Sequence, residues 1–271
     1  MSRSSSAHNL ASLLARSAHV WPRQPAIALG DKPLHDYATL AGRVSRLGGA
    51  LRSQGHELGT RVLLIASNVP AYIEAMLSCW WAGCVAVPVN AKLHPREALY
   101  VLDNSGASVV FADAGWEDAV RVEGSAHRAR IVRFDGAEYT RMLAAEPITA
   151  PVEVRSDDAA WLFYTSGTTG RPKGVVLTHA NLFAMTLAFL ADVEPIARGD
   201  AIVHAAPLSH GSGLYVVPNI ARGAVNVVPE SGGFDAHEVA SLINAWPRAM
   251  LFAAPTMLKR LVQSPAASSI D

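Results

Sequence analysis

The feature that most constrains the fold is a regular alternation of short apolar runs with stretches of helical period. The apolar runs are uninterrupted, which is typical of parallel strands covered by helices on both faces. The expected strands are Arg61 to Ala66, Cys84 to Pro88, Ser108 to Ala112, Ile131 to Phe134, Trp161 to Tyr164, Ala201 to Ala205, Val225 to Val228 and Met250 to Ala253. The expected helices are Ala71 to Trp81, Pro95 to Asn104, Trp116 to Val120, Ala180 to Ala191, Gly213 to Ile220, Ala236 to Ala245 and Pro255 to Val262. This order predicts an α/β fold with a doubly wound parallel sheet.

The segment before this alternation predicts a helix, a hairpin and a second helix. Asn9 can cap a helix that reaches about His19. The apolar run from Pro25 to Leu29 and the pair Leu34-His35 flank Gly30-Asp31, which favours a short hairpin. Residues 38–54 have helical period and end before Gly55. Residues 146–158 form the most polar connection and are the expected linker into the next strand.

Composition excludes several classes of protein. The 271 residues include 50% apolar and only 17% charged residues, enough material for a large core or for two lobes. The 23 basic and 23 acidic residues balance, so we expect no nucleic-acid partner. The longest stretches without charged residues are broken by proline and glycine, and no export signal is visible, so we expect no transmembrane segment and a cytoplasmic location. The two cysteines, Cys79 and Cys84, are expected to be buried, reduced thiols, and no metal spacing is present.

The stretch with the clearest chemical meaning follows the apolar run that ends at Tyr164. Seven of the ten residues from Thr165 to Gly174 are Thr, Ser or Gly, and a second apolar run begins at Val175. The glycines let the backbone take positive φ and bring N–H groups close to a ligand, the hydroxyls add donors, and Lys173 adds a cation. Many donors at short range suit a polyphosphate. The spacing differs from that of the common phosphate-binding loop Gly-x-x-x-x-Gly-Lys-Ser/Thr, which disfavours a kinase or GTPase of that class.

Residues Thr165 to His179 resemble the signature loop of the adenylate-forming (AMP-binding) superfamily, which includes acyl-CoA synthetases, luciferases and peptide-synthetase adenylation domains. The resemblance implies an acyl-CoA synthetase-like N-terminal domain of two packed, doubly wound sheets with flanking helices. It groups residues 46–194 into one subdomain and residues 1–45 with 195–271 into another. It also implies ATP, Mg²⁺ and CoA as cofactors. The implied nucleotide-binding residues are Thr165, Ser166, Gly167, Thr168, Thr169, Gly170 and Lys173, with Lys173 also catalytic.

A second motif, from Pro207 to Gly213, follows an expected strand at the carboxyl end, where open α/β sheets place ligands. A lone histidine is usually a core or surface residue, but this Pro-Leu-x-His-x-x-Gly pattern resembles one in acyl-CoA synthetases. The resemblance implies that His210 lies beside the acyl carboxylate and the nucleotide, as a catalytic and substrate-binding residue. Gly211 and Gly213 are expected to leave room for an acyl chain.

Other patterns have structural readings. The small residues between Trp81 and Asn90 are expected to pack a helix end against a buried strand, although this segment also resembles a superfamily motif. Residues 254–257 match a family segment near the acyl pocket, and a proline at the first helical turn explains them as well. Glu74 and Asp103 are expected to be solvated carboxylates on helices.

The resemblance also implies parts that these residues do not contain. The superfamily's Tyr-Gly-x-Thr-Glu segment, its ribose-binding Thr-Gly-Asp segment and its small C-terminal domain with a catalytic lysine have no counterpart between Met1 and Asp271. We therefore expect a truncated N-terminal domain of an AMP-forming acid–thiol ligase, acting on a carboxylic acid, with a fatty acid as the favoured class. The chain alone is expected to be inactive and to self-associate through uncovered apolar surface.

Two other interpretations stay open at this stage. The chain could be a non-catalytic, half-length protein that binds nucleotide or acyl groups, or part of an adenylation domain that loads a carrier protein. A reading frame that continues beyond Asp271 would argue against the first, and a thiol-acceptor assay would decide the second. Acyl chain length, aromatic or aliphatic preference and oligomeric state are not determined by the sequence.

Overall fold

A computed structural model describes residues 8–116, 129–165 and 172–270. The chain divides into two compact units. The first unit comprises Met1–Ser12, Gly42–Ala66 and Glu74–Phe183, and the second comprises Leu13–Ala41, Ser67–Ile73 and Ala184–Asp271. Each unit contains one mixed, mostly parallel sheet, so the α/β class expected from the sequence is confirmed.

The sheet of the first unit has the strand order β6-β5-β3-β4-β7-β8. Its strands are β3 (Arg61–Ala66), β4 (Val85–Asn90), β5 (Val109–Ala112), β6 (Arg130–Arg133), β7 (Ala159–Thr165) and β8 (Lys173–Thr178). The chain starts at the centre with β3 and adds strands on both sides, which is the doubly wound pattern. All neighbouring strands are parallel except β8, which runs antiparallel to β7.

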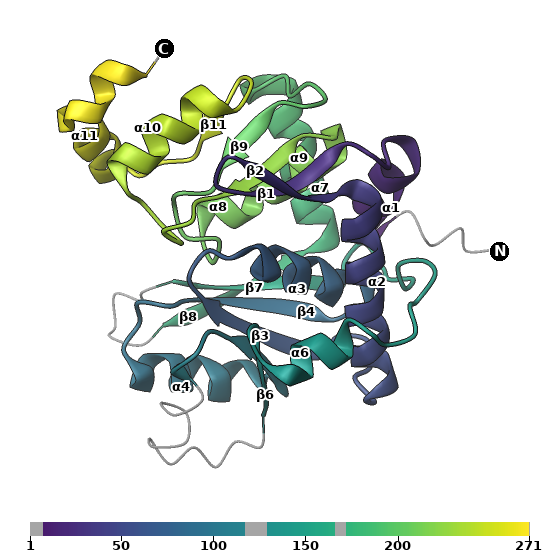
Figure 1. Ribbon diagram of the computed structural model, residues 1–271. Helices are drawn as coiled ribbons and strands as arrows, with labels where there is room; N and C mark the ends of the chain where they lie inside the picture. The colour runs from purple at the N-terminus through teal and green to yellow at the C-terminus, as the bar shows by residue number, and fades with distance from the viewer. Residues whose placement is uncertain (1–7, 117–128, 166–171, 271) are drawn as a thin grey trace. The chain divides into compact units, whose positions relative to one another are not determined.

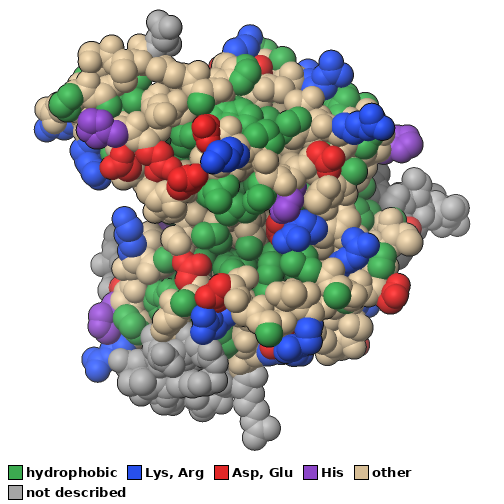
Figure 2. All heavy atoms as spheres, viewed as in Figure 1, with side chains coloured by type: hydrophobic (Ala, Val, Ile, Leu, Met, Phe, Trp, Pro, Cys, Tyr) green, Lys and Arg blue, Asp and Glu red, His purple; other side chains and the backbone are tan. Residues whose placement is uncertain are grey.

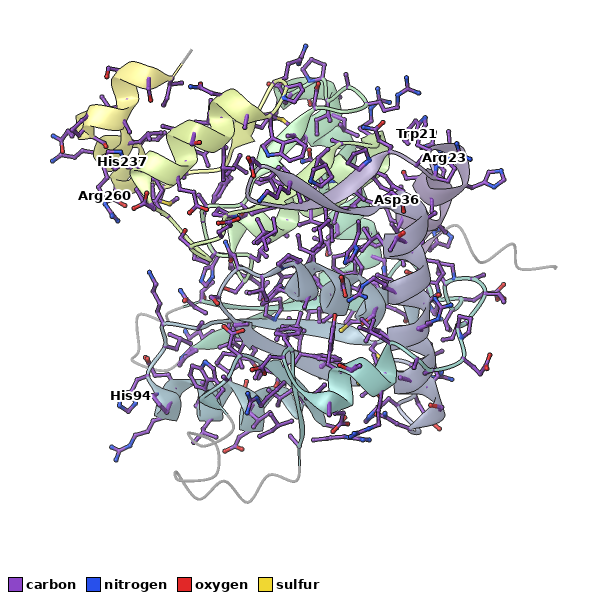
Figure 3. All side chains as sticks on the ribbon, viewed as in Figure 1. Trp21, Arg23, Asp36, His94, His237 and Arg260 are labelled. Atoms are coloured by element: carbon purple, nitrogen blue, oxygen red, sulfur yellow. The ribbon has the colours of Figure 1, made fainter. Side chains whose placement is uncertain are left out.

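Helices cover both faces of this sheet, with α3 and α4 on opposite sides (Figure 1). The described helices that contribute most to this unit are α2 (Tyr37–Ser53), α3 (Pro70–Trp81), α4 (Pro95–Ser105), α6 (Ala137–Met142) and α7 (His179–Ala188). The sequence fixes α4 locally: His94 caps its first turn with a capping box to Glu97, Pro95 starts it, and Gly106 ends it at φ 65° (Figure 3). Its apolar face, including Leu99 and Leu102, packs on the strands.

The sheet of the second unit has the order β11-β9-β10-β1-β2. Its strands are β1 (Pro25–Leu29), β2 (Lys32–Asp36), β9 (Ala201–Val203), β10 (Val225–Val228) and β11 (Met250–Leu251). The helical elements are α1 (Ala11–Val20), the π-helix η2 (Phe189–Val193), α8 (Gly211–Leu214), α9 (Val216–Arg222), α10 (Ala236–Ala245), α11 (Pro255–Gln263) and the 3₁₀-helix η3 (Pro265–Ser269). The expected hairpin is confirmed as the antiparallel β1–β2 pair.

Several expectations about local structure need correction. The strands expected to reach Ala205 and Ala253 end at Val203 and Leu251. The single helix expected from Gly213 to Ile220 is two helices, α8 and α9, separated at Tyr215. The helix expected to reach Ala191 ends at Ala188 and continues as the π-helix η2. The short helix α6 was not expected at all. Of the helix expected from Trp116 to Val120, only Trp116 lies within the described residues.

The prediction that residues 81–90 belong to the core is confirmed, but the prediction that Glu74 is solvated is wrong. Val85, Val87 and Val89 of β4 are all buried, as is the adjoining helix end. Glu74 is only 1% exposed because it accepts two hydrogen bonds from Arg43, both at 2.9 Å, and one from Tyr139 Oη at 2.6 Å. A buried carboxylate with these partners is a structural ion pair and not a solvated surface group.

Candidate functional site

The first group of expected site residues lies at the end of the β7–β8 hairpin. The strand pairing sets Thr165 directly opposite Lys173, and Tyr164 opposite Gly174. Both Thr165 and Lys173 are exposed, so a hydroxyl and an ammonium group face solvent at the carboxyl end of β7. The other expected nucleotide-binding residues, Ser166, Gly167, Thr168, Thr169 and Gly170, lie outside the described residues.

Tyr164 anchors the base of this hairpin. Its hydroxyl donates to Asn104 Oδ1 on α4 at 2.7 Å. Its ring lies against Gly174, where an added Cβ would stand 3.0 Å from Tyr164 Cζ. Gly174 does not have positive φ, so the sequence argument for this glycine needs correction: close packing against Tyr164 explains it, and left-handed backbone does not. The hairpin stem is thereby tied to α4 immediately before the loop.

The second group lies in the second unit, after β9. His210 is half-buried and precedes the first turn of α8. Its Nδ1 lies 2.9 Å from Ser209 Oγ. Burial lowers the pKa of His210 below its ordinary value of 6.5, so the imidazole is neutral at physiological pH. A neutral ring can accept a hydrogen bond at one nitrogen while it donates from the other.

A buried hydrogen-bond relay supports the start of α8. His204 has no exposed surface; its Nε2 donates to Asn226 Oδ1 at 3.0 Å and its Nδ1 accepts from Ser212 Oγ at 2.8 Å. Asn226 Nδ2 in turn donates to the Ala26 carbonyl at 3.2 Å. Burial lowers the pKa of His204 to about 4, which keeps the ring neutral. Sequence reasoning missed this relay, although a lone asparagine within the apolar run of β10 was an available signal.

Asn68 fixes the chain between β9 and α8. Its Nδ2 donates to the carbonyls of His204, at 2.6 Å, and Ala206, at 2.8 Å. Its Oδ1 accepts from the Leu208 backbone N–H at 2.9 Å. One buried amide therefore satisfies three backbone groups on both sides of Pro207, which cannot donate a hydrogen bond of its own. Sequence analysis gave no indication of this role.

An aromatic cavity of about 400 Å³ lies next to the histidine motif. Phe189, Tyr215 and Phe252 line it, with ring centroids 4.9 Å apart for Phe189–Tyr215 and 5.2 Å apart for Tyr215–Phe252. The Phe252 ring also lies on Gly211, where an added Cβ would be 2.3 Å from Cζ. Gly211 thus makes room for the ring of Phe252, which forms a wall of the cavity, while Gly213 is buried within α8.

The expected site residues form one group in each unit. Thr165 and Lys173 are brought together in the first unit, and His210, Gly211 and Gly213 in the second. Over residues 8–116, 129–165 and 172–270, no group of three or more His, Cys, Asp or Glu side chains is placed to hold a metal ion. The described chain also contains no helix long and apolar enough to cross a bilayer. On the face shown in Figure 2, basic side chains are scattered among acidic and neutral ones.

Comparison with known proteins assigns the chain to the family described as AMP-binding enzyme. Residues 14–270 match the family model with that description, and the chain belongs to this family, with an acyl-CoA synthetase-like N-terminal domain. Feruloyl-CoA synthase from Amycolatopsis sp is 33% identical over 264 residues, which are 97% of this chain and 52% of that protein. Long-chain-fatty-acid–CoA ligase FadD13 from Mycobacterium tuberculosis is 29% identical over 269 residues, or 97% of this chain and 53% of the relative.

Solved structures agree with this assignment. The N-terminal domain of FACL13 from Mycobacterium tuberculosis superimposes with a TM-score of 0.87 at 26% identity, over 97% of this chain and 67% of that one. ATP-bound MatB from Rhodopseudomonas palustris gives a TM-score of 0.80 at 29% identity, over 94% of this chain and 52% of MatB. The chain spans about half the length of the curated relatives it matches.

Proposed function

We propose that this chain is the N-terminal part of an AMP-forming acid–CoA ligase. The observation that carries the proposal is the pairing of Thr165 with Lys173 at the mouth of the expected phosphate loop, in a chain of the AMP-binding enzyme family. A hydroxyl donor and an exposed ammonium group on neighbouring strands suit the oxygens of ATP phosphates. The crystal structure of MatB with ATP bound supports nucleotide binding by a related fold.

The reaction would proceed in two steps. A carboxylate oxygen of the acid attacks the α-phosphorus of ATP, the bond from that phosphorus to the bridging oxygen breaks, and pyrophosphate leaves. The CoA thiolate then attacks the acyl carbon and releases AMP. Charge grows on the departing pyrophosphate, so Lys173 would stabilise the transition state of the first step, with loop donors from Thr165 to Gly170 holding the phosphates. Mg²⁺ bound to ATP would neutralise further phosphate charge.

His210 would position the acid for this attack. Its neutral imidazole can donate one hydrogen bond to the carboxylate of the acid. An imidazolium ion would in addition neutralise the negative charge of the attacking carboxylate. The other ring nitrogen of His210, Nδ1, lies 2.9 Å from Ser209 Oγ. The relay through His204 and Ser212 would keep the first turn of α8, and with it His210, in place.

Two finer points belong to the same proposal. CoA is the proposed acceptor, while Fatty acid–[acyl-carrier-protein] ligase ScoC from Streptomyces coeruleorubidus, 29% identical, supports a carrier protein as the alternative. We also propose a cytoplasmic reaction, because Cys79 and Cys84 are free thiols and burial raises the pKa of both. The chain by itself would self-associate.

The experiment compares the chain alone with a hybrid protein. In the hybrid, residues 1–271 are joined to the part of Amycolatopsis feruloyl-CoA synthase that lies beyond the matched region. Hydroxamate trapping with ATP, Mg²⁺ and a panel of fatty and aromatic acids should give acid-dependent product with the hybrid and none with the chain alone. A folded hybrid that forms no adenylate with any acid would contradict the proposal. Product from the chain alone would show that its own residues suffice.

A further inference from the structure

Three aromatic rings line the cavity beside the histidine motif. Phe189 comes from the π-helix η2, Tyr215 from the break between α8 and α9, and Phe252 from the residue after β11. Three separate segments therefore each contribute one ring. All three rings are half-buried, so part of each remains accessible within the cavity. The cavity lies in the second unit, as do its neighbours α8 and β11 (Figure 1).

The three rings are tilted relative to one another. The planes of Phe189 and Tyr215 are inclined at 54°, and those of Tyr215 and Phe252 at 39°, so neither pair is stacked face to face. Tilted rings leave faces and edges free for further offset or edge contacts. The other lining residues are mostly apolar, among them Val193, Ile202 and Met250, with Glu194 as a charged group.

The sequence around the cavity also favours a ring at position 252. Gly211 is half-buried, and any side chain there would overlap the Phe252 ring, since an added Cβ would be 2.3 Å from Cζ and 2.5 Å from Cε1. The motif residue next to His210 is therefore fitted to an aromatic side chain. An alkyl ligand needs only apolar surface, which leucine or isoleucine would supply. A planar ligand gains further from aromatic walls.

The size of the cavity points in the same direction. Its volume of about 400 Å³ is at the lower end of the range for small-molecule sites, about 300–1,000 Å³. A compact, rigid ligand also loses fewer rotamers on binding than a long alkyl chain does. Because Phe252 contacts Gly211, a ligand among these rings lies near the segment that carries His210.

We propose that this cavity binds the ring of an aromatic carboxylic acid, and that Phe252 is a specificity-determining residue that favours such acids over aliphatic ones. This inference rests on the proposed function in taking an acid as the ligand. It departs from the fatty acid favoured by the sequence. The preference comes from ring–ring contacts with Phe189, Tyr215 and Phe252, in addition to the apolar burial that an alkyl acid would share.

Binding to chain 1–271 tests the proposal without any need for catalysis. Isothermal titration compares trans-cinnamate with nonanoate, two acids of equal carbon number. We expect cinnamate to bind about tenfold more tightly. Phe252→Leu keeps an apolar side chain and removes the ring, and should weaken cinnamate about fivefold with less than a twofold effect on nonanoate. Phe134→Leu is the matched control, because Phe134 belongs to an aromatic cluster with Phe111 and Tyr139 in the first unit.

Equal affinity for the two acids, equal losses in Phe252→Leu, or no binding of either acid would overturn the proposal. If Phe252→Leu does not fold, Tyr215→Leu replaces it, and nuclear Overhauser contacts between cinnamate and aromatic protons of the wild-type chain give a readout that needs no variant. The hybrid protein separates this inference from the proposed function. Adenylation of nonanoate but not cinnamate would refute the inference alone, whereas ring-dependent cinnamate binding without any adenylation would refute the function alone.

Discussion

Acidification should weaken the second unit through His204. Burial lowers the pKa of this histidine from its ordinary value of 6.5 to about 4, so the unfolded chain takes up the proton first as the pH falls. The stabilising contribution is therefore fully present above pH 6.5 and is lost as the pH falls from 6.5 toward 4. At about 1.36 kcal/mol for each pH unit, the full effect is about 3 kcal/mol, of which roughly 2.5 kcal/mol is lost by pH 4.5.

The variant His204→Gln isolates this effect. At pH 7 it should lower the free energy of unfolding by about 1–3 kcal/mol, because glutamine cannot serve both Ser212 and Asn226 as the ring does. Its stability should also fall less between pH 7 and 4.5 than that of the wild type, by up to about 2.5 kcal/mol. His179, whose pKa burial also lowers to about 4, titrates in the same range in both proteins and cancels in the comparison.

Urea unfolding followed by tryptophan fluorescence measures these differences. The matched control is His237→Gln, since His237 is exposed on α10 (Figure 3) and its replacement should change the free energy of unfolding at pH 7 by less than about 0.5 kcal/mol. If wild type and His204→Gln lose the same stability between pH 7 and 4.5, His204 is not a neutral buried group and the relay is assigned wrongly. If His237→Gln alters the loss of stability between pH 7 and 4.5 as much as His204→Gln does, the effect is not specific to the relay.

Three further changes test other parts of the structure. Lys173→Ala in the hybrid protein should slow acid-dependent pyrophosphate exchange about a hundredfold with unchanged unfolding, because Lys173 is exposed; normal exchange would contradict its role. Glu74→Gln should lower the free energy of unfolding by about 3 kcal/mol, seen as a fall in Tm of roughly 6–12 °C. The matched control Glu153→Gln, at an exposed position, should change the free energy of unfolding by less than about 0.5 kcal/mol. Gly211→Ala should cost about 1–3 kcal/mol in urea unfolding because its Cβ would overlap Phe252, and an unchanged midpoint would contradict that contact.

The elements that the sequence predicted well are those whose signals are local. The strand from Arg61 to Ala66 has the expected bounds, since an apolar run with turn residues on both sides needs no distant partner to be recognised. The α4 helix follows from Pro95 at its start and Gly106 after its end. The apolar runs on both sides of the polar loop are the strands β7 and β8, whereas their pairing, which sets Thr165 opposite Lys173, was not predicted.

Long-range contacts explain some of the errors. Glu74 is buried because Arg43 and Tyr139, 31 and 65 residues away, reach its carboxylate. The sequence analysis predicted a solvated Glu74 because it considered only the helix that carries this residue. The break between α8 and α9 had a local signal that the expected single helix left out, because Pro218 has no N–H to donate to the Leu214 carbonyl. The aromatic cavity could not be predicted because Phe189, Tyr215 and Phe252 come from separate segments of the chain.

The three hydrogen bonds of the Asn68 side chain show why part of the site could not be predicted from the sequence. Pro207 has no N–H and the chain leaves β9 at Val203, so the carbonyls of His204 and Ala206 must find donors outside a regular strand. The motif therefore requires a polar partner. The sequence analysis did not anticipate Asn68 in this role, since it lies 138 residues before Ala206 and follows β3. Once it is in place, the same amide also binds the Leu208 N–H, and the backbone that presents His210 is fixed from both sides of the proline.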